Sequence, residues 1–274
     1  MEFNLSTAKD AYNAIIKSKD IAELTAVMTS IDIADLVVLD GFRLNEAKAA
    51  CSALLRCMCD YPQIRRSFNY FGTLEGCEQN KDQLWLKLNP DAEYDILESM
   101  KDYVEKGLEG CKNAFDKKGA GFAMHWWKEN HEFFGVKTYT FSCLILNHRM
   151  LVDSVDSLKT VNQTNFKHLQ APSAASSIKA LVDHEFGHII DFDLKISMSR
   201  EFGQVVRFYG TERLRKGLSQ YAVSTGNSKE QEVLAEAFSE FRNSREPREI
   251  ARRVVTMMEM EYRKIFRKPS GGLR

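Results

Sequence analysis

The amino-acid sequence predicts an α+β fold that is predominantly helical, with a small mixed sheet and an N-terminal helical extension. Apolar residues recur at helical spacing in residues 1–60 and again in residues 228–241 and 248–268. Residues 138–146 have the β-branched and aromatic composition of a strand. Residues 180–193 are almost wholly apolar apart from one charged motif, so we expect a buried helix there, bordered by the sheet.

Composition limits the classes of partner. The 274 residues, 44% of them hydrophobic, suffice for one large core with a helical extension. The 38 basic and 38 acidic residues balance, so overall charge gives no reason to expect nucleic acid as a partner. No apolar run approaches a membrane span, and residues 1–20 lack the pattern of a secretory signal. We therefore expect a cytoplasmic protein with no membrane partner, or one that is virion-associated or exported independently of such a signal.

Residues 1–60 are predicted to form a helical region distinct from residues 61–274. Asp20 and Glu23 have the spacing of a capping box, and residues 45–59 carry the apolar periodicity of a further helix. Nothing in this region suggests chemistry, so we expect it to pack on the rest of the chain or to bind a partner. The six cysteines of the chain form no Cys-x-x-Cys pair, and we expect reduced thiols packed on helices.

The middle of the chain supplies the expected sheet. Residues 66–74 are rich in aromatic side chains and suit a strand, and a long helix is expected to begin near residue 91 and to end near residue 115. The aromatic cluster of residues 122–134 is predicted to pack in the core or along a cleft wall. If the strand at residues 138–146 lies at an edge, which the sequence leaves open, an extended peptide could pair with it.

The charged motif within residues 180–193 is His184-Glu185-x-x-His188. On a helix both imidazoles point to one place and Glu185 stands beside them, an arrangement that suits zinc with a carboxylate able to take a proton from activated water. So short a motif also arises by chance, with histidines that lie in the core or on the surface. The apolar surroundings favour a metal, because burying these groups without partners would cost roughly a few kcal/mol each.

A third metal ligand is available downstream. Residues 228–241 predict a helix with apolar side chains on one side and Glu232, Glu236 and Glu240 on another. A solvated acidic face is the ordinary explanation of such a pattern. A catalytic zinc site, however, takes three protein ligands and keeps a fourth position open. Beside the histidine motif, we therefore expect one of these glutamates to be the third ligand.

The segments HEFGHIID at residues 184–191, Tyr221-Ala222 and EVLAEAF at residues 232–238 resemble zinc metallopeptidases of the gluzincin type, among them the catalytic domain of anthrax lethal factor. The chain also resembles the metallopeptidase domain of phage minor head proteins and mobile elements, in residues 140–147, 176–188 and 246–254. Together these resemblances cover the last half to two-thirds of the chain. They imply a zincin-like metallopeptidase fold for residues 61–274.

The resemblance also implies roles for individual residues. Zinc would be bound by His184, His188 and Glu232, the first glutamate of ExxAE, and Glu185 would be the catalytic base. Tyr221 is the candidate donor that stabilises the oxyanion in the transition state. Should its hydroxyl face elsewhere, other residues of the 221–231 loop or Tyr209 would be considered for that donor.

Two further carboxylates could orient a histidine ligand from behind. Glu236 follows Glu232 by one helical turn, and Asp191 shares a helical face with the two histidines. For Asp191 the alternative is a solvated carboxylate at the end of its helix.

The expected function is that of a zinc-dependent endopeptidase acting on a protein or peptide substrate. One alternative is a non-catalytic phage or mobile-element head or assembly protein that retains a metallopeptidase-like fold. Another is a host-directed effector protease, and in either setting a phage or host protein could bind the N-terminal helical region. The presence of Glu185 argues against a purely structural metal site, which does not need it.

Overall fold

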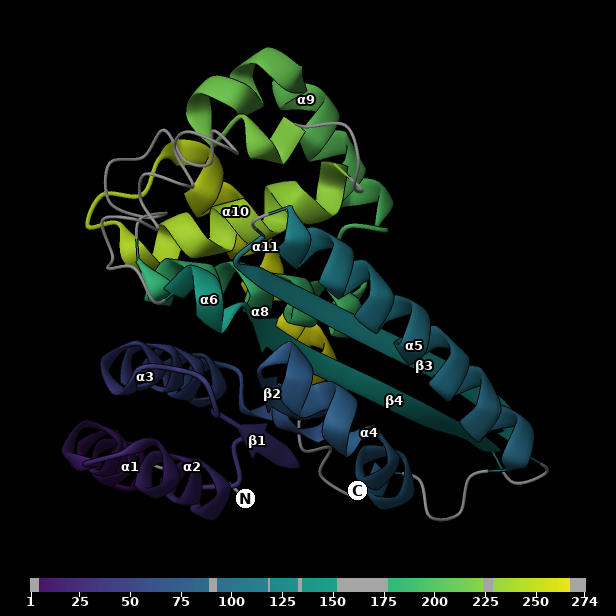
Figure 1. Ribbon diagram of the computed structural model, residues 1–274. Helices are drawn as coiled ribbons and strands as arrows, with labels where there is room; N and C mark the ends of the chain where they lie inside the picture. The colour runs from purple at the N-terminus through teal and green to yellow at the C-terminus, as the bar shows by residue number, and fades with distance from the viewer. Residues whose placement is uncertain are drawn as a thin grey trace, which may run out of the picture. The chain divides into compact units, whose positions relative to one another are not determined.

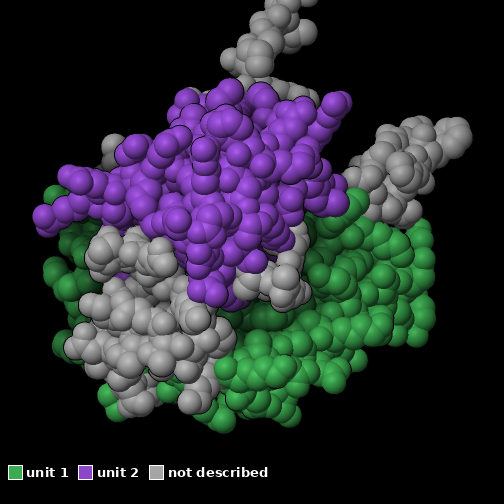
Figure 2. Space-filling model, turned by 90° about the horizontal axis from the view of Figure 1, so that it is seen from above, with its two compact units in different colours: residues 1–153 green, residues 154–274 purple. Residues whose placement is uncertain are grey.

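The computed structural model describes residues 5–88, 93–117, 119–132, 135–151, 177–223 and 229–266. Backbone contacts divide the chain into two compact units, Met1–Asp153 and Ser154–Arg274, which Figure 2 distinguishes by colour. The predicted domain boundary after residue 60 stays a prediction.

The first unit contains a mixed sheet of four strands in the order β1-β2-β4-β3 (Figure 1). Strands β1 (Leu36–Val38), β2 (Phe68–Gly72) and β4 (Gly135–Leu146) are parallel neighbours, and β3 (Gly121–Glu132) runs antiparallel to β4. The prediction of an α+β fold with a small mixed sheet is confirmed. Because β4 pairs with a strand on either side, it is an interior strand.

Helices α4 (Leu74–Leu88) and α5 (Tyr94–Asp116) pack against this sheet. Four residues of α5, Ile96, Met100, Val104 and Leu108, face the core at intervals of four, as their spacing predicts. They meet Met124, Trp126, Tyr139, Phe141, Cys143 and Ile145 from the two long strands. The aromatic cluster at residues 122–134 thus includes a strand, whose side chains alternate between this core and the opposite face.

Helices α1 (Leu5–Lys17), α2 (Ile21–Ser30) and α3 (Leu44–Asp60) lie in the N-terminal part of the first unit. The 3₁₀ turn η1 (Pro62–Arg66) connects α3 to β2, and the short helix α6 (His148–Leu151) follows β4. Asp20 caps α2 as predicted, accepting a hydrogen bond from the Glu23 N–H at 2.8 Å. Residues 1–60 are not wholly helical, because β1 lies among them. All six cysteines are free thiols, five of them on helices and Cys143 on β4.

The second unit is helical in its described part. Helix α8 (Ile178–Leu194) is followed by α9 (Arg200–Gly217), the 3₁₀ turn η3 (Tyr221–Val223), α10 (Lys229–Asn243) and α11 (Glu249–Phe266). Helix α10 packs along α8 and also contacts α9, η3 and α11. The helices predicted at residues 180–193, 228–241 and 248–268 are confirmed within their described residues, whereas α9 was not predicted.

The sheet belongs to the first unit and α8 to the second, so the predicted contact between them stays a prediction. None of the helices in the described ranges combines the length and hydropathy that a membrane crossing requires.

Candidate metal centre

Helix α8 carries the histidine motif in a buried environment. The Ser177 hydroxyl caps the helix by accepting a hydrogen bond from the Ala180 N–H at 3.1 Å. Nearly every residue from Ile178 to Leu194 is buried or partly buried, as the apolar composition predicts. Only 8% of His184 and 7% of Glu185 is exposed. Polar side chains buried to this extent need hydrogen-bond, ionic or metal partners.

Helix α10 approaches α8 closely enough to supply those partners. A Cβ atom added to Gly187 would lie 3.0 Å from the Cα of Ala235, so the glycine lets the two backbones meet. The Ser239 hydroxyl donates to the Ala180 carbonyl at 2.7 Å and ties the helices together further along. This packing brings the first turns of α10 beside the histidines.

Glu232, in the first turn of α10, faces both histidines of the motif. One of its carboxylate oxygens, Oε2, lies 3.5 Å from His184 Nε2 and 3.7 Å from His188 Nε2. Two ligand atoms of a tetrahedral zinc ion are separated by about 3.3 Å, given zinc–ligand bonds of about 2.0–2.1 Å. The three ligand atoms of this group all lie within 4.8 Å of one another, so the group could hold a metal ion.

Glu236 lies one turn further along α10, behind His184. Its Oε1 is 2.9 Å from His184 Nδ1, so the two nitrogens of one imidazole face two different glutamates. Burial alone would lower the pKa of His184, but the hydrogen bond and charge of Glu236, with the charges of Glu185 and Glu232, raise that pKa to about 9. The arrangement holds the ring with Nε2 toward Glu232.

His188 has the opposite electrostatic balance. Burial and the nearby charge of His184 lower the pKa of His188 to about 3, so its imidazole is neutral at pH 7. Its ring packs edge-on against the His184 ring, with centroids 4.9 Å apart, and stacks on Phe192 at 6.4 Å. A neutral imidazole is the form that binds a metal.

Tyr221, the first residue of η3, is brought to the same place by the turn after α9. Its ring centroid lies 6.0 Å from that of His184. Burial and the charges of Glu232, Glu185 and Glu236 raise the pKa of Tyr221, so its hydroxyl stays protonated and can donate a hydrogen bond. Tyr209, the other tyrosine considered, donates its hydroxyl to Glu249 Oε1 at 3.1 Å.

No protein-family model, curated protein or solved structure matches this chain. The resemblance to gluzincin-type metallopeptidases therefore stays a prediction from the sequence motifs.

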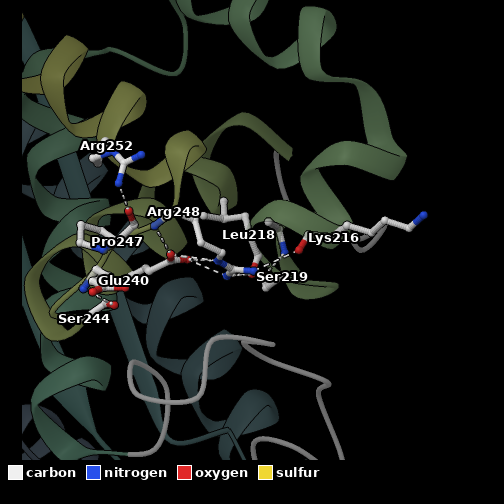
Figure 3. A network of polar contacts seen from close by, with 10 residues as sticks. Lys216, Leu218, Ser219, Glu240, Ser244, Pro247, Arg248 and Arg252 are labelled. Carbon is white, nitrogen blue, oxygen red and sulfur yellow. Dashed lines mark hydrogen bonds and ion pairs between the residues drawn. The ribbon is translucent and has the colours of Figure 1, made fainter.

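The three glutamates of α10 are not a solvated acidic face. Glu232, Glu236 and Glu240 are 3%, 1% and 0% exposed, so that alternative is wrong. Glu240 does not join the other two, since its carboxylate pairs with Arg248 at 2.6 Å (Figure 3).

Asp191 is buried, at 2% exposed, so the alternative of a solvated carboxylate is wrong for it as well. Its Oδ1 accepts a hydrogen bond from the Ser197 N–H at 2.7 Å, which holds the loop after α8. Burial raises the pKa of Asp191, although the hydrogen bonds from that loop lower it. Its role in orienting a histidine stays a prediction.

Asp183, immediately before the motif, was missed by the sequence reasoning. It is fully buried and accepts hydrogen bonds from Arg242 Nε at 3.1 Å and from Asn243 Nδ2 at 2.6 Å. These contacts join α8 to the end of α10, on the same pair of helices that carries the metal-binding group. A carboxylate in so apolar a helix indicates a buried partner, but the sequence does not say which residue provides it.

Proposed function

We propose that this protein is a zinc-dependent endopeptidase. The observation that carries the proposal is the convergence of His184 Nε2 and His188 Nε2 on one oxygen of Glu232, with Glu185 on the same helix. The donor set is two imidazole nitrogens and one carboxylate oxygen, which is a common ligand set of catalytic zinc and leaves a fourth position open. A zincin-like fold around the group is part of the same proposal.

Each residue around the metal would have a separate role in peptide hydrolysis. When bound, zinc would supply Lewis-acid chemistry, polarising a peptide carbonyl and making water a stronger acid. Glu185 would accept the proton of the attacking water and return it to the leaving amine. Glu236, bonded to His184 Nδ1, would keep that ring turned toward the ion, and the protonated hydroxyl of Tyr221 would donate to the oxyanion.

Metal-dependent cleavage of a peptide library tests the proposal. Zinc would be removed from the wild-type protein with a chelator and restored, with zinc content and cleavage products measured at each step. We expect about one zinc per chain and cleavage only in the zinc-loaded protein, with both lost in His184→Ala. His148→Ala is the matched control, because His148 lies on α6, outside the group, and should leave both unchanged.

Two results would contradict the proposal. A protein that takes up no zinc on reconstitution has no metal centre of this kind. A protein that binds zinc through His184 and His188 but cleaves no peptide would support the alternative of a non-catalytic assembly role.

A further inference from the structure

The segment that carries Tyr221 is held where it leaves the end of α9. Helix α9 ends at Gly217, and only three residues separate it from the turn η3. Within the segment, the Ser219 hydroxyl accepts a hydrogen bond from the Ala222 N–H at 3.0 Å. That bond shapes the turn itself. Where the turn lies relative to α8 and α10 depends on contacts from outside it.

Arg248 supplies such contacts from the loop before α11 (Figure 3). One terminal nitrogen, Nη1, donates to the Lys216 carbonyl at 3.0 Å, and the other, Nη2, donates to the Leu218 carbonyl. The Lys216 carbonyl lies in the last turn of α9 and the Leu218 carbonyl directly after it, where backbone acceptors lack partners within the helix. A guanidinium group can bind both at once because its donors point in several fixed directions.

Glu240 of α10 holds the other side of the guanidinium. Its carboxylate accepts hydrogen bonds from Arg248 Nε at 2.9 Å, from Arg248 Nη2 at 2.6 Å and from the backbone N–H of Arg248 at 2.8 Å. Glu240 is fully buried, so screening by solvent is weak and the pair is held in one geometry. Glu240 lies two turns after Glu232, so one helix anchors both the metal-binding group and the segment of Tyr221.

We infer that Arg248, held by Glu240, is a positioning residue that sets the place of Tyr221 relative to His184. Besides the direct packing of η3 on α10, a chain of contacts runs from α10 through Arg248 to the end of α9 and from there to Tyr221. The consequence for catalysis rests on the proposed function, whereas the consequence for the order of the turn does not. A pair that only stabilised the fold would not act through Tyr221 in particular.

Hydrogen exchange measures the positioning without any assay of activity. In the wild type, amides of residues 218–223 should be protected, and Arg248→Gln should speed their exchange by about tenfold or more while α8 is unchanged. Arg252→Gln is the matched control, because Arg252 donates its hydrogen bond to the Pro247 carbonyl of the same loop, at 2.6 Å. Unchanged exchange at residues 218–223 in Arg248→Gln would overturn the inference.

Loss of Arg248 leaves a buried carboxylate without its cation, which can unfold the protein. The double variant Glu240→Gln/Arg248→Gln removes that charge as well as the contacts to α9. It should fold, keep its zinc and show the same faster exchange at residues 218–223. Wild-type exchange in a folded double variant would equally overturn the inference.

A double-mutant cycle tests whether the effect passes through Tyr221. Arg248→Gln should lower kcat about tenfold with KM nearly unchanged, and less than about twofold in the Tyr221→Phe background, because coupled residues are not additive. Equal losses in both backgrounds would show that Arg248 acts in another way. If the zinc-loaded wild type cleaves no peptide, the proposed function fails, and hydrogen exchange alone decides whether Arg248 holds this turn.

Discussion

Zinc binding is predicted to displace a proton from His184 and therefore to depend on pH. In the metal-free protein, burial lowers the pKa of His184, but the contact with Glu236 and the charges of Glu185 and Glu232 raise it to about 9. The pKa of His188 is lowered to about 3 by its burial and by the charge of His184. At pH 7, His188 is ready to bind a metal and His184 is an imidazolium that must first lose its proton.

The size of the effect follows from a single proton. Below its pKa, each unit of pH changes the share of neutral His184 about tenfold, so the apparent Kd for zinc should rise about a hundredfold between pH 8 and pH 6. Competition with a chromophoric chelator, corrected for the protonation of the chelator itself, measures this change. Calorimetry in two buffers of different ionisation enthalpy counts the protons released.

Glu236→Gln tests whether the raised pKa of His184 is the cause of the pH dependence. It removes the carboxylate that holds the proton on His184, so the pKa should fall toward its ordinary value and affinity should vary little above pH 7. Glu230→Gln, on the same helix but outside the group, should keep the wild-type dependence. A zinc affinity of the wild type that does not change between pH 6 and pH 8 would refute the reasoning.

Three other substitutions test the packing of α8 on α10. Glu232→Gln should weaken zinc binding more than Glu236→Gln, for which a loss of about 10- to 100-fold is expected at a pH above 9, where His184 is mostly neutral in either case. The reverse order in a metal-competition titration would move the ligand by one turn. Gly187→Ala should reduce the free energy of unfolding, measured in urea, by about 1–3 kcal/mol, because the added Cβ would press on Ala235. An unchanged free energy of unfolding would show that the two helices can move apart to accept the methyl group. Asp183→Asn should reduce the same free energy of unfolding by about 3 kcal/mol, because it leaves the charge of Arg242, the buried partner of Asp183, uncompensated. A reduction of less than about 1 kcal/mol would contradict this prediction.

The local patterns of the sequence predict most of the helices that form the metal centre. The apolar circumference of residues 180–193 predicts α8, and the spacing of the motif predicts that its histidines point the same way. The glutamates of α10 are predicted as a set. Which of them meets the histidines depends on the register of α10 against α8, set by the close approach of Gly187 to Ala235, and that long-range contact leaves no local pattern.

Other elements were missed for similar physical reasons. The backbone of α9 breaks at Gly210, where φ is 64°, and this interrupts the periodicity by which a helix is recognised. Strand β3 has large aromatic side chains on both faces, since Trp126 is buried and 44% of Trp127 is exposed, so the alternation of a half-buried strand is hidden. The parallel pairing of β2 with β4 joins residues about seventy positions apart and is a property of tertiary structure alone.

The rate of peptide cleavage by zinc-loaded Glu185→Gln, relative to the zinc-loaded wild type, tests the central claim most directly. The substitution preserves the size of the side chain and leaves His184, His188 and Glu232 untouched, so zinc content and folding should be unchanged. We predict a loss of about 10²- to 10⁴-fold, the usual contribution of a general base. Cleavage by the zinc-loaded variant at the wild-type rate would contradict the proposed role of Glu185 and the mechanism built on it.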